Sequence, residues 1–470
     1  MKKIALYQPK HIYAPQTGNG HIYMPTSLLS VGARIIKAGG DVEIADGNLQ
    51  ETPQDPAVIG VNLLGAAYIQ TALELRKQID SAVPMLLGGQ VINGLSGEQI
   101  KRMFGDNTFN GNNDQTLSDI LQLQTSSRLR VMNSSNKLPT PEETSLIVAY
   151  EKISDANMRE YLSREFSFYL SQGCKFNCEF CAADRSMVNP VTHEKKATEE
   201  RYRSMEVIEK DLRYLVKRAQ SLGINSLDMY LSNLDLFQTP EKLLNFANIV
   251  IAIKKENPGF EFKMRGLATV TSFLIDSHEK MPKVINAIRE AGLERIGFGV
   301  DGMTPKVWKS IKKGHNTKDK CVESVRVARE VYGITPEVLM VFGHEKDTKH
   351  SLELALEFAI DMRDRYGAIP RPHVTKDLVP GNEIWLKPEN QDRVDQFLEH
   401  PEYFQALDFT ALPSPLTHPN ARKRRLVEKY FRMMTSILEN TTQPIYPISP
   451  SATKKENALG QRLNVGKYDL

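Results

Sequence analysis

The sequence predicts an α/β protein: a doubly wound parallel sheet, then a partial (β/α)6 barrel of the TIM type, then a mostly helical C-terminal region. Three observations support this prediction. Apolar, strand-like runs alternate with helical patterns over residues 1–125. The same alternation returns from residue 166 to about residue 385, and three clustered cysteines directly follow the first strand of this second series. Strands that alternate with helices are typical of parallel sheets.

Length and composition limit the classes of protein that the chain can represent. With 470 residues, two or three domains are expected. The content of 41% hydrophobic and 25% charged residues is that of a soluble globular protein, and no apolar run approaches the ~20 residues of a membrane span. The net charge of +3 is too small to indicate a nucleic-acid partner, and the basic run at residues 422–425 is best explained as a solvated helix face.

Cysteine usage and the first residues predict a cellular location. The chain has four cysteines, three of them clustered, which favours a reducing compartment. Residues 1–7 become polar at once, as expected for a first strand and not for a signal peptide. We therefore expect a cytoplasmic protein.

The N-terminal segment, residues 1–125, contains the first series of strands and helices. Strands are expected at 4–7, 41–46, 57–62 and 84–89, and helices at 27–38 and 66–80. No Gly-x-Gly-x-x-Gly follows the first strand, so a nicotinamide or flavin dinucleotide is not supported. In such sheets ligands bind at the carboxyl ends of the strands. The candidate binding residues at these ends are Gln8, Asn62, Leu63, Gly88, Gly89 and Gly111.

A segment rich in Ser, Thr, Asn and Pro separates this series from the next, and we expect a linker over residues 126–160. The barrel is expected over residues 161–385 and the helical C-terminal region over residues 386–470. The barrel strands are expected at 166–171, 225–231, 261–265, 295–300, 336–342 and 369–378. Helices are expected between them and beyond, at 204–221, 240–256, 281–291, 317–331, 350–365, 391–399 and 424–438. Barrels of this type place their chemistry at the carboxyl ends of the strands.

Cys174, Cys178 and Cys181 have the spacing Cys-x3-Cys-x2-Cys. Thiols this close do not suit a disulfide framework, but they can converge on one metal centre. No fourth cysteine lies nearby, which fits an iron–sulfur cluster with one open iron. A structural zinc site usually has four protein ligands, and the nearest candidate, His193, lies twelve residues further on. Cys321 stands apart and is expected to be a buried, unreactive thiol.

With this motif, the central segment resembles the radical SAM family. The resemblance implies that Cys174, Cys178 and Cys181 bind three irons of a 4Fe-4S cluster, whose fourth iron binds S-adenosylmethionine (SAM). It further implies contacts to SAM from Phe180, which would lie against the adenine, and from Asn233, Asp235, Arg265 and Asp301. For Arg265 and Asp301, an ion pair at the barrel rim is the alternative interpretation.

The N-terminal segment resembles the Rossmann-like cobalamin-binding domain of cobalamin-dependent radical SAM enzymes. The resemblance rests on residues 24–29, 37–46, 55–61 and 86–89. It implies that cobalamin is bound by the strand-end residues Gln8, Asn62, Leu63, Gly88, Gly89 and Gly111. The Asp-x-His-x-x-Gly motif that supplies a lower histidine ligand to cobalt in other cobalamin proteins is absent. His11 and His21 are the two histidines of this segment and are expected to be exposed loop residues.

Together, the resemblances imply a cobalamin-dependent radical SAM methyltransferase. Such an enzyme moves a methyl group from SAM through methylcobalamin to a carbon of a small-molecule or natural-product substrate, and it needs an electron donor such as flavodoxin or ferredoxin. Partners of the nucleic-acid or membrane class are not expected. Three alternatives stay open: another cobalamin-dependent reaction, such as rearrangement, ring contraction, cyclisation or non-radical methylation; a cobalamin-free N-terminal domain that docks a partner; and a zinc-binding structural protein.

Overall fold

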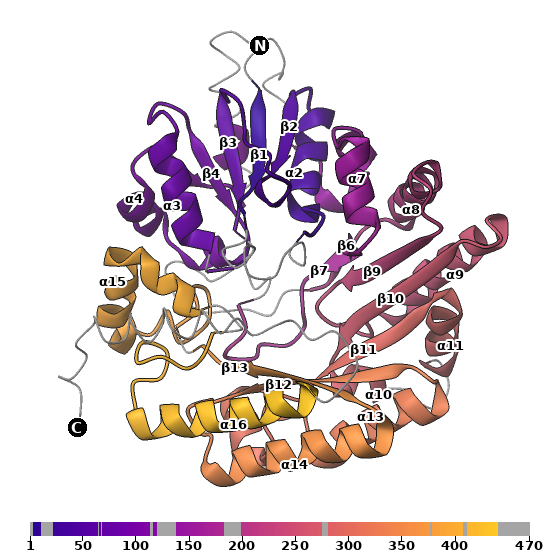
Figure 1. Cartoon of the computed structure of the whole chain (residues 1–470), viewed down its shortest axis with the longest axis vertical. Coiled ribbons are helices and arrows are strands. Elements are labelled where there is room, and N and C mark those ends of the chain that lie inside the picture. The colour runs from indigo at the N-terminus through magenta and orange to yellow at the C-terminus, as the bar shows by residue number, and fades with distance from the viewer. Residues whose placement is uncertain are drawn as a thin grey trace.

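The computed structural model describes residues 3–10, 22–63, 65–66, 68–112, 116–119, 138–182, 199–274, 281–376, 378–407 and 411–439. Two parallel sheets organise the chain, one with five strands and one with six (Figure 1). A two-stranded antiparallel ribbon adds a third, small sheet. The predicted α/β fold class, with a doubly wound sheet and a partial barrel, is confirmed.

The five-stranded sheet has the order β2-β1-β3-β4-β5. Side chains on one face pack against α2, and those on the other pack against α3 and α4, which makes the sheet doubly wound. The strand order reverses between β1 and β3, so the ligand-binding switch point lies at their carboxyl ends. The elements are β1 (Ile4–Gln8), α2 (Thr26–Lys37), β2 (Val42–Asp46), β3 (Val58–Asn62), α3 (Tyr68–Gln78), β4 (Met85–Gly88), α4 (Gly97–Phe104) and β5 (Thr108–Asn110).

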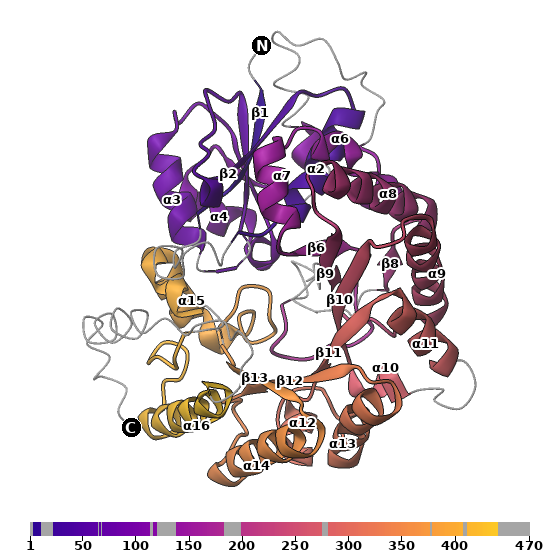
Figure 2. The same cartoon turned by 45° about the vertical axis from the view of Figure 1, so that its right-hand side comes forward.

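The six-stranded sheet has the order β13-β12-β11-β10-β9-β6, so each strand pairs with its predecessor in the barrel sequence. Figure 2 shows these strands as an open arc with the helices outside it. The strands are β6 (Glu165–Tyr169), β9 (Ser226–Ser232), β10 (Glu261–Ala268), β11 (Leu293–Gly299), β12 (Thr335–Phe342) and β13 (Ile369–Val374). The helices are α8 (Met205–Ser221), α9 (Pro240–Glu256), α10 (Val270–Leu274), α11 (Met281–Ala291), α12 (Pro305–Ser310), α13 (Lys318–Arg326) and α14 (Lys349–Tyr366).

Alternation along the barrel strands separates a helix-facing side from an interior side. In β10, Phe262 and Met264 are buried in the main hydrophobic core, whereas Arg265 between Met264 and Gly266 is only partly buried. The helix predicted at 317–331 is α-helical only to Arg326 and continues as a π-helix at Val327–Val331. The spacing of apolar residues in the sequence does not distinguish an α-helix from a π-helix.

The segment predicted as a linker is helical in its described part. It forms a 3-10 turn at Pro141–Glu143, then α6 (Ile147–Tyr150) and α7 (Asp155–Leu162). Tyr150 and Met158 from these helices are buried in the same core as the barrel strands. These helices are too short for a hydrophobic period to show in the sequence. The residues 126–137, with most of the Ser and Asn, lie outside the described residues.

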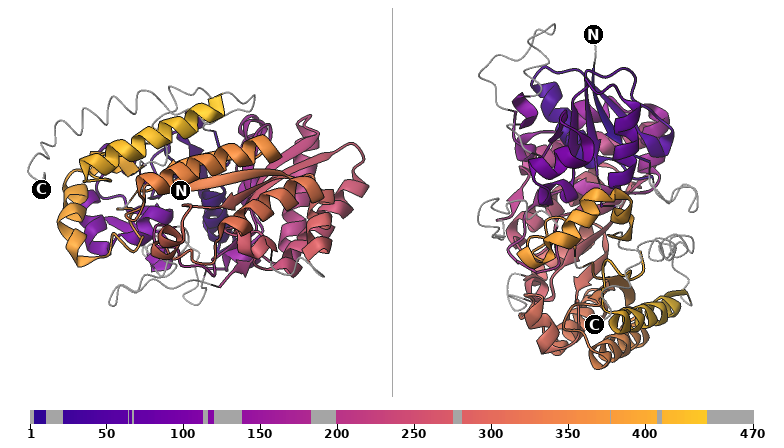
Figure 3. Two further views of the ribbon diagram at one scale, coloured as in Figure 1. Left: turned by 90° about the horizontal axis from the view of Figure 1, so that it is seen from below. Right: turned by 90° about the vertical axis from the view of Figure 1, so that its left-hand side faces the viewer.

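The C-terminal region packs against both sheets. Trp385, Phe397 and Phe404 share a core with the N-terminal strands β3 and β4 and with α3 and α4. Arg102 on α4 also donates to Asp395 and Glu399, both at 2.7 Å. The elements are α15 (Gln391–Glu399), a 3-10 helix at Pro401–Leu407, and α16 (Ala421–Glu439), which runs beside α14 (Figure 3). The N-terminal sheet therefore lies across the open side of the barrel, held at both flanks (Figure 1).

Within the described residues, no helix is long and apolar enough to cross a membrane. The basic run is less solvated than the sequence predicted. Lys423 donates to the carbonyl of His344, and Arg424 donates to the carbonyl of His418 at 2.8 Å. Lys423 thus holds α16 to the turn after β12, and Arg424 holds it to the segment directly before the helix.

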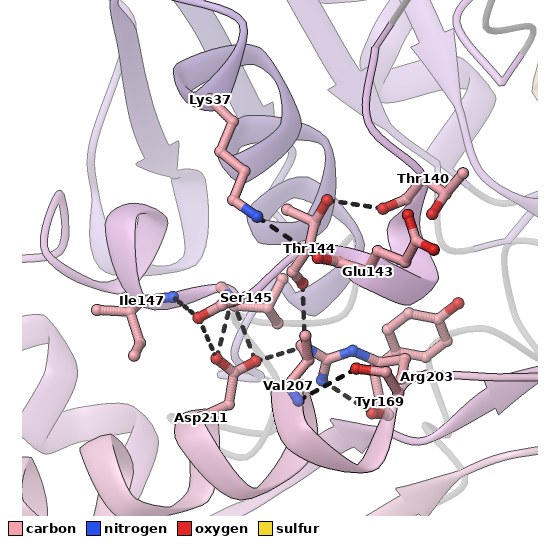
Figure 4. Close-up of polar contacts among 12 residues, drawn as sticks. Lys37, Thr140, Glu143, Thr144, Ser145, Ile147, Tyr169, Arg203, Val207 and Asp211 are labelled. Carbon is pink, nitrogen blue, oxygen red and sulfur yellow. Dashed lines mark hydrogen bonds and ion pairs between the residues drawn. The ribbon is translucent and has the colours of Figure 1, made fainter.

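A buried ion pair joins the helical linker to the barrel (Figure 4). The side chains of Arg203 and Asp211 form it, and neither has any exposed area. Asp211 also accepts from the hydroxyl of Ser145 at 2.5 Å and from the backbone N–H of Leu146 at 3.1 Å. Arg203 donates to the carbonyl of Tyr169 at 3.1 Å. The pair therefore fixes the linker, the end of β6 and the first turns of α8 against one another.

Replacing Asp211 should destabilise the protein strongly. Asp211→Asn leaves the charge of Arg203 buried without a counter-charge, which costs about 3–5 kcal/mol of unfolding free energy. Urea unfolding followed by circular dichroism measures this loss. Glu256→Gln is the control, because it weakens a solvent-exposed ion pair between Glu256 on α9 and Arg213 on α8, the helix that carries Asp211. It should change stability little. Equal effects of the two substitutions would contradict the role given to the buried pair.

Candidate functional site

The three clustered cysteines lie at the carboxyl end of the barrel. They follow β6 and the ribbon strand β7 (Ser171–Gln172), which pairs with β8 (Arg201–Tyr202). As thiols, Cys174 and Cys178 are buried and Cys181 is half-buried. Backbone hydrogen bonds hold the second half of the loop: the N–H of Cys181 donates to Cys178 at 3.3 Å, and the N–H of Glu179 donates to Ile311 at 3.1 Å.

The donor set suits a cluster better than a single ion. Within the described ranges, no group of three or more His, Cys, Asp or Glu side chains is arranged to hold one metal ion. The alternative zinc ligand His193 lies outside the described residues. In a 4Fe-4S cluster each thiolate binds a different iron, so the thiols need not converge on one point. Three cysteines on one loop therefore fit a cluster with an open iron.

A buried lysine lies beside this loop and was missed from the sequence. The Lys313 ammonium group donates to the carbonyl of Gly299 at 3.1 Å and forms an ion pair with Asp301. Burial opposes the charge, but Asp301 and the thiols of Cys178 and Cys181 together raise the pKa of Lys313. A fixed positive charge near a thiol favours its thiolate form. One lysine in a chain with 60 basic residues gives no sequence signal of this role.

Asp301 is engaged on both carboxylate oxygens. Oδ2 pairs with Lys313, and Oδ1 accepts from the backbone N–H of Val341 at 3.1 Å. The structure thus shows the ion pair that was the alternative interpretation for this residue. Its contact with SAM stays a prediction.

Arg265 lies deeper in the barrel than expected. The strand β10 continues to Ala268, so Arg265 is in its middle and not at its end. Its guanidinium donates to Glu165 at 2.7 Å and lies 4.5 Å from the ring centroid of Tyr230. The structure shows an ion pair here too, but in the interior of the barrel and not at its rim. The contact of Arg265 with SAM stays a prediction. The pairs continue across the interior of the barrel as Glu165–Arg295, Arg295–Glu337 and Glu337–Arg371.

Asn233 and Asp235 follow β9 and have different surroundings. Asp235 accepts from the N–H of Thr269 at 3.2 Å, from its hydroxyl at 3.1 Å and from Ser272. Burial raises the pKa of Asp235, which these hydrogen bonds partly offset. Asn233 is only 4% exposed, and neither amide atom has a hydrogen-bond partner among the described residues. Because an unsatisfied buried amide is costly, Asn233 is suited to bind a polar group of a ligand.

The aromatic residues of the loop pack against histidines. Phe180 lies with its ring centroid 5.1 Å from that of His344, and Phe176 lies 4.5 Å from that of His315. Burial lowers the pKa of His315 to about 4, so this ring is neutral at physiological pH. The contact of Phe180 with an adenine stays a prediction. Cys321 is fully buried, and burial raises its pKa to about 12, as expected for an unreactive thiol.

The residues predicted to bind cobalamin lie at the carboxyl ends of the strands of the N-terminal sheet, along one edge of it. Asn62 donates to Gln8 at 2.8 Å at the switch point between β1 and β3. Gly89 has a φ of +107°, and a Cβ there would lie 2.1 Å from the carbonyl oxygen of Leu63. Gly88 precedes it at the end of β4, and the N–H of Gly111 donates to Leu87 at 2.7 Å beyond β5. His11 and His21 lie outside the described residues.

The ligand-binding edges of the two sheets meet. After β4, a 3-10 helix (Gln90–Gly94) reaches the turn after β13. A Cβ on Gly94 would lie 1.8 Å from the backbone nitrogen of Gly381, so no other residue fits there without moving the backbone. A Cβ on Gly381 would in turn lie 4.0 Å from that of Ala182, the residue after Cys181. The close approach of Gly94 and Gly381 was not evident from the sequence, because single glycines are common in turns.

Comparison with known proteins identifies the central domain. Residues 168–359 match the family model of the Radical SAM superfamily. The chain contains a radical SAM domain. Such a domain implies a 4Fe-4S cluster and SAM as cofactors. A methyltransferase of Pyrococcus horikoshii, named as the uncharacterized methyltransferase PH0819, is 24% identical over 217 residues, which are 46% of this chain. This chain spans only 40% of that relative.

Solved structures share the whole fold. The radical SAM methyltransferase TsrM from Kitasatospora setae, with cobalamin and a [4Fe-4S] cluster bound, has a TM-score of 0.60 and 12% identity. The alignment covers 83% of this chain and 75% of that one. The cobalamin-dependent SAM radical enzyme OxsB, with aqua-cobalamin and SAM bound, has a TM-score of 0.58 and 14% identity over 98% of this chain and 66% of that one. At such identities the likeness is one of fold alone.

The buried histidine His418 should make stability depend on pH. It lies 3.1 Å from the hydroxyl oxygen of Thr417 and 3.1 Å from the carbonyl of Gly343. Burial, with Lys376 nearby, lowers its pKa from an ordinary 6.5 to about 3. Between about pH 3 and pH 6.5, the unfolded chain therefore binds a proton at His418 that the folded chain does not. The contribution to stability is complete above pH 6.5 and is lost towards about pH 3, by up to ~1.4 kcal/mol per pH unit.

His418→Gln should flatten this dependence. Urea unfolding of the metal-free protein at about pH 7 and about pH 5 gives the difference in unfolding free energy for each variant. We expect a smaller difference for His418→Gln than for the parent. His400→Gln is the matched control, because the side chain of His400 is 51% exposed. An unchanged difference in His418→Gln would show that this histidine is not held neutral.

Proposed function

We propose that the protein is a cobalamin-dependent radical SAM methyltransferase that methylates a carbon of a small-molecule or natural-product substrate. One observation carries the proposal: the turn after β13, which adjoins the cysteine loop, touches the carboxyl edge of a second, doubly wound sheet. Gly94 beyond β4 contacts Gly381 beyond β13, and a Cβ on Gly381 would lie 4.0 Å from that of Ala182, the residue after Cys181. Ligands bound at the two edges would therefore lie on the sides of the sheets that face each other.

The residues for the first cofactor pair come from the barrel. Cys174, Cys178 and Cys181 would hold the cluster, and Lys313 would balance part of the charge of their thiolates. The amide of Asn233, buried and without a partner, would hydrogen-bond a polar group of SAM. A reduced cluster supplies the electron that cleaves SAM, and cobalamin supplies a methyl carrier. That electron would come from a donor such as flavodoxin or ferredoxin.

The residues for cobalamin come from the N-terminal sheet. TsrM and OxsB, which share the fold, were solved with cobalamin bound. Here Gln8 and Asn62 stand at the switch point, and the backbone at Leu63, Gly88, Gly89 and Gly111 forms the edge beside them. A Cβ at Gly65, beyond β3, would meet no described atom within 4 Å. The sequence lacks the Asp-x-His-x-x-Gly motif that supplies a lower histidine ligand in other cobalamin proteins, which suits cobalamin bound without a protein imidazole.

The assignment as a methyltransferase, and not another cobalamin-dependent enzyme, rests on the relatives. TsrM and the Pyrococcus protein are both named methyltransferases. A TsrM structure was solved with tryptophan as substrate, which supports a small molecule as the substrate class. A mass increase by one trideuterated methyl group in a product formed from methyl-deuterated SAM would support methylation. Product formation without that increase would favour rearrangement or cyclisation.

Cofactor loading tests the proposal before a substrate is known. Protein reconstituted with iron, sulfide and hydroxocobalamin should keep both the cluster and the cobalamin absorption bands after desalting. Cys178→Ala should lose the cluster band, because it removes one of three thiolate ligands. Cys321→Ala should keep it, because Cys321 is buried in the main hydrophobic core and is not part of the cysteine loop.

Circular dichroism melting shows whether each cysteine variant is folded. A cluster band that survives in folded Cys178→Ala would contradict the ligand assignment. A parent protein that loads the cluster but keeps no cobalamin would contradict the methyltransferase and favour an N-terminal domain that only docks a partner.

A further inference from the structure

One glutamine side chain grips the backbone on both sides of Cys174. Gln238 lies between β9 and α9, directly after the buried Phe237. Its Nε2 donates to the carbonyl of Gly173 at 3.0 Å, and its Oε1 accepts from the N–H of Lys175 at 3.3 Å. Both groups of the amide are thus used on the two neighbours of a single cysteine.

A second set of hydrogen bonds, made by Glu200, holds the residues next to this amide. The carboxylate of Glu200 accepts from the hydroxyl of Ser171 at 2.6 Å and from Thr239, the residue after Gln238. Glu200 therefore ties the strand before the loop to the segment that carries Gln238. The antiparallel ribbon of β7 and β8 adds a second connection beside this one, because it pairs Gln172 with Arg201.

Gly173 brings the chain into the loop in a conformation that favours glycine. Its φ is +99°, and a Cβ there would lie 2.2 Å from the carbonyl oxygen of Glu199. Glycine restricts φ and ψ little, so Gly173 does not by itself fix the direction of the next residues. The two hydrogen bonds of Gln238 limit that freedom on both sides of Cys174.

The other two cysteines have separate supports. Cys178 and Cys181 are joined by a backbone hydrogen bond of 3.3 Å, and Glu179 between them donates to Ile311 at 3.1 Å. The first and second halves of the loop are therefore held by different parts of the barrel. Loss of the Gln238 contacts should displace Cys174 and leave the other two cysteines in place.

We propose that Gln238 is the positioning residue for Cys174 as a ligand of the cluster; this inference rests on the proposed function only in that a cluster is bound there. Residues that hold metal ligands in place typically contribute a factor of 10–100 to metal affinity. Gln238 touches neither the cluster iron nor SAM in this role. It acts through the backbone on either side of Cys174.

The test compares cluster retention among matched variants. Gln238→Met keeps the length of the side chain and removes both hydrogen bonds, and Gln238→Glu keeps the acceptor for the N–H of Lys175. Gln220→Met is the control, because the Gln220 side chain donates to Asn257 at the exposed surface, at 3.3 Å, and not to the cysteine loop. Each protein is reconstituted anaerobically with iron and sulfide, and the rate of iron loss to a chelator is measured. Melting of the metal-free proteins checks folding.

We expect Gln238→Met to lose iron at least about 10-fold faster than the parent, at an unchanged melting temperature of the metal-free chain. Gln238→Glu should fall between them, and Gln220→Met should match the parent. The electron paramagnetic resonance signal of the reduced cluster should broaden in Gln238→Met, since the position of one thiolate is no longer fixed. A purely structural role would not produce this broadening in a protein of unchanged stability.

The outcomes separate the two claims. Equal iron loss from Gln238→Met and Gln220→Met, with a cluster present in the parent, would overturn the role of Gln238 alone. A parent that assembles no cluster would overturn the proposed function, and the inference with it.

Discussion

The buried ion pair of Arg203 and Asp211 is the interaction on which the geometry of the site depends. Neither side chain reaches solvent, so each charge needs the other. Satisfying both brings the helical linker, the end of β6 and the start of α8 to one point. Arg203 also donates hydrogen bonds to the carbonyls of Tyr169 and Leu170, immediately before the ribbon that leads to Gly173. The buried ion pair therefore sets the position at which the cysteine loop begins.

The open barrel gives the second sheet its place. Six strands do not close into a cylinder, and the uncovered side must be protected from solvent by other parts of the chain. The linker helices share the main core with the barrel, and the C-terminal region shares a core with the N-terminal sheet. Hydrophobic burial on both flanks thus holds the N-terminal sheet over the cysteine loop. The polar edges of the two sheets meet because their apolar flanks are packed.

Local patterns were sufficient to predict the longer strands, most helices and the cysteine motif, because alternation and spacing are properties of neighbouring residues. The short strands β5, β7 and β8 were missed. Contacts between distant residues could not be read in this way. Arg265 pairs with Glu165, which is 100 positions earlier, and this pairing places it in the barrel interior and not at the rim. Lys313 and Gln238 take their roles from the loops that they meet in the fold. The sequence contains these residues but does not identify their partners.

We propose that the three cysteines hold a 4Fe-4S cluster whose remaining iron binds SAM. Mössbauer spectroscopy of protein reconstituted with iron-57, recorded with and without SAM, tests this assignment. SAM should change the isomer shift and quadrupole splitting of a single iron of the cluster and leave the others as they were. A spectrum that SAM does not alter, in protein that contains the full cluster, would contradict it.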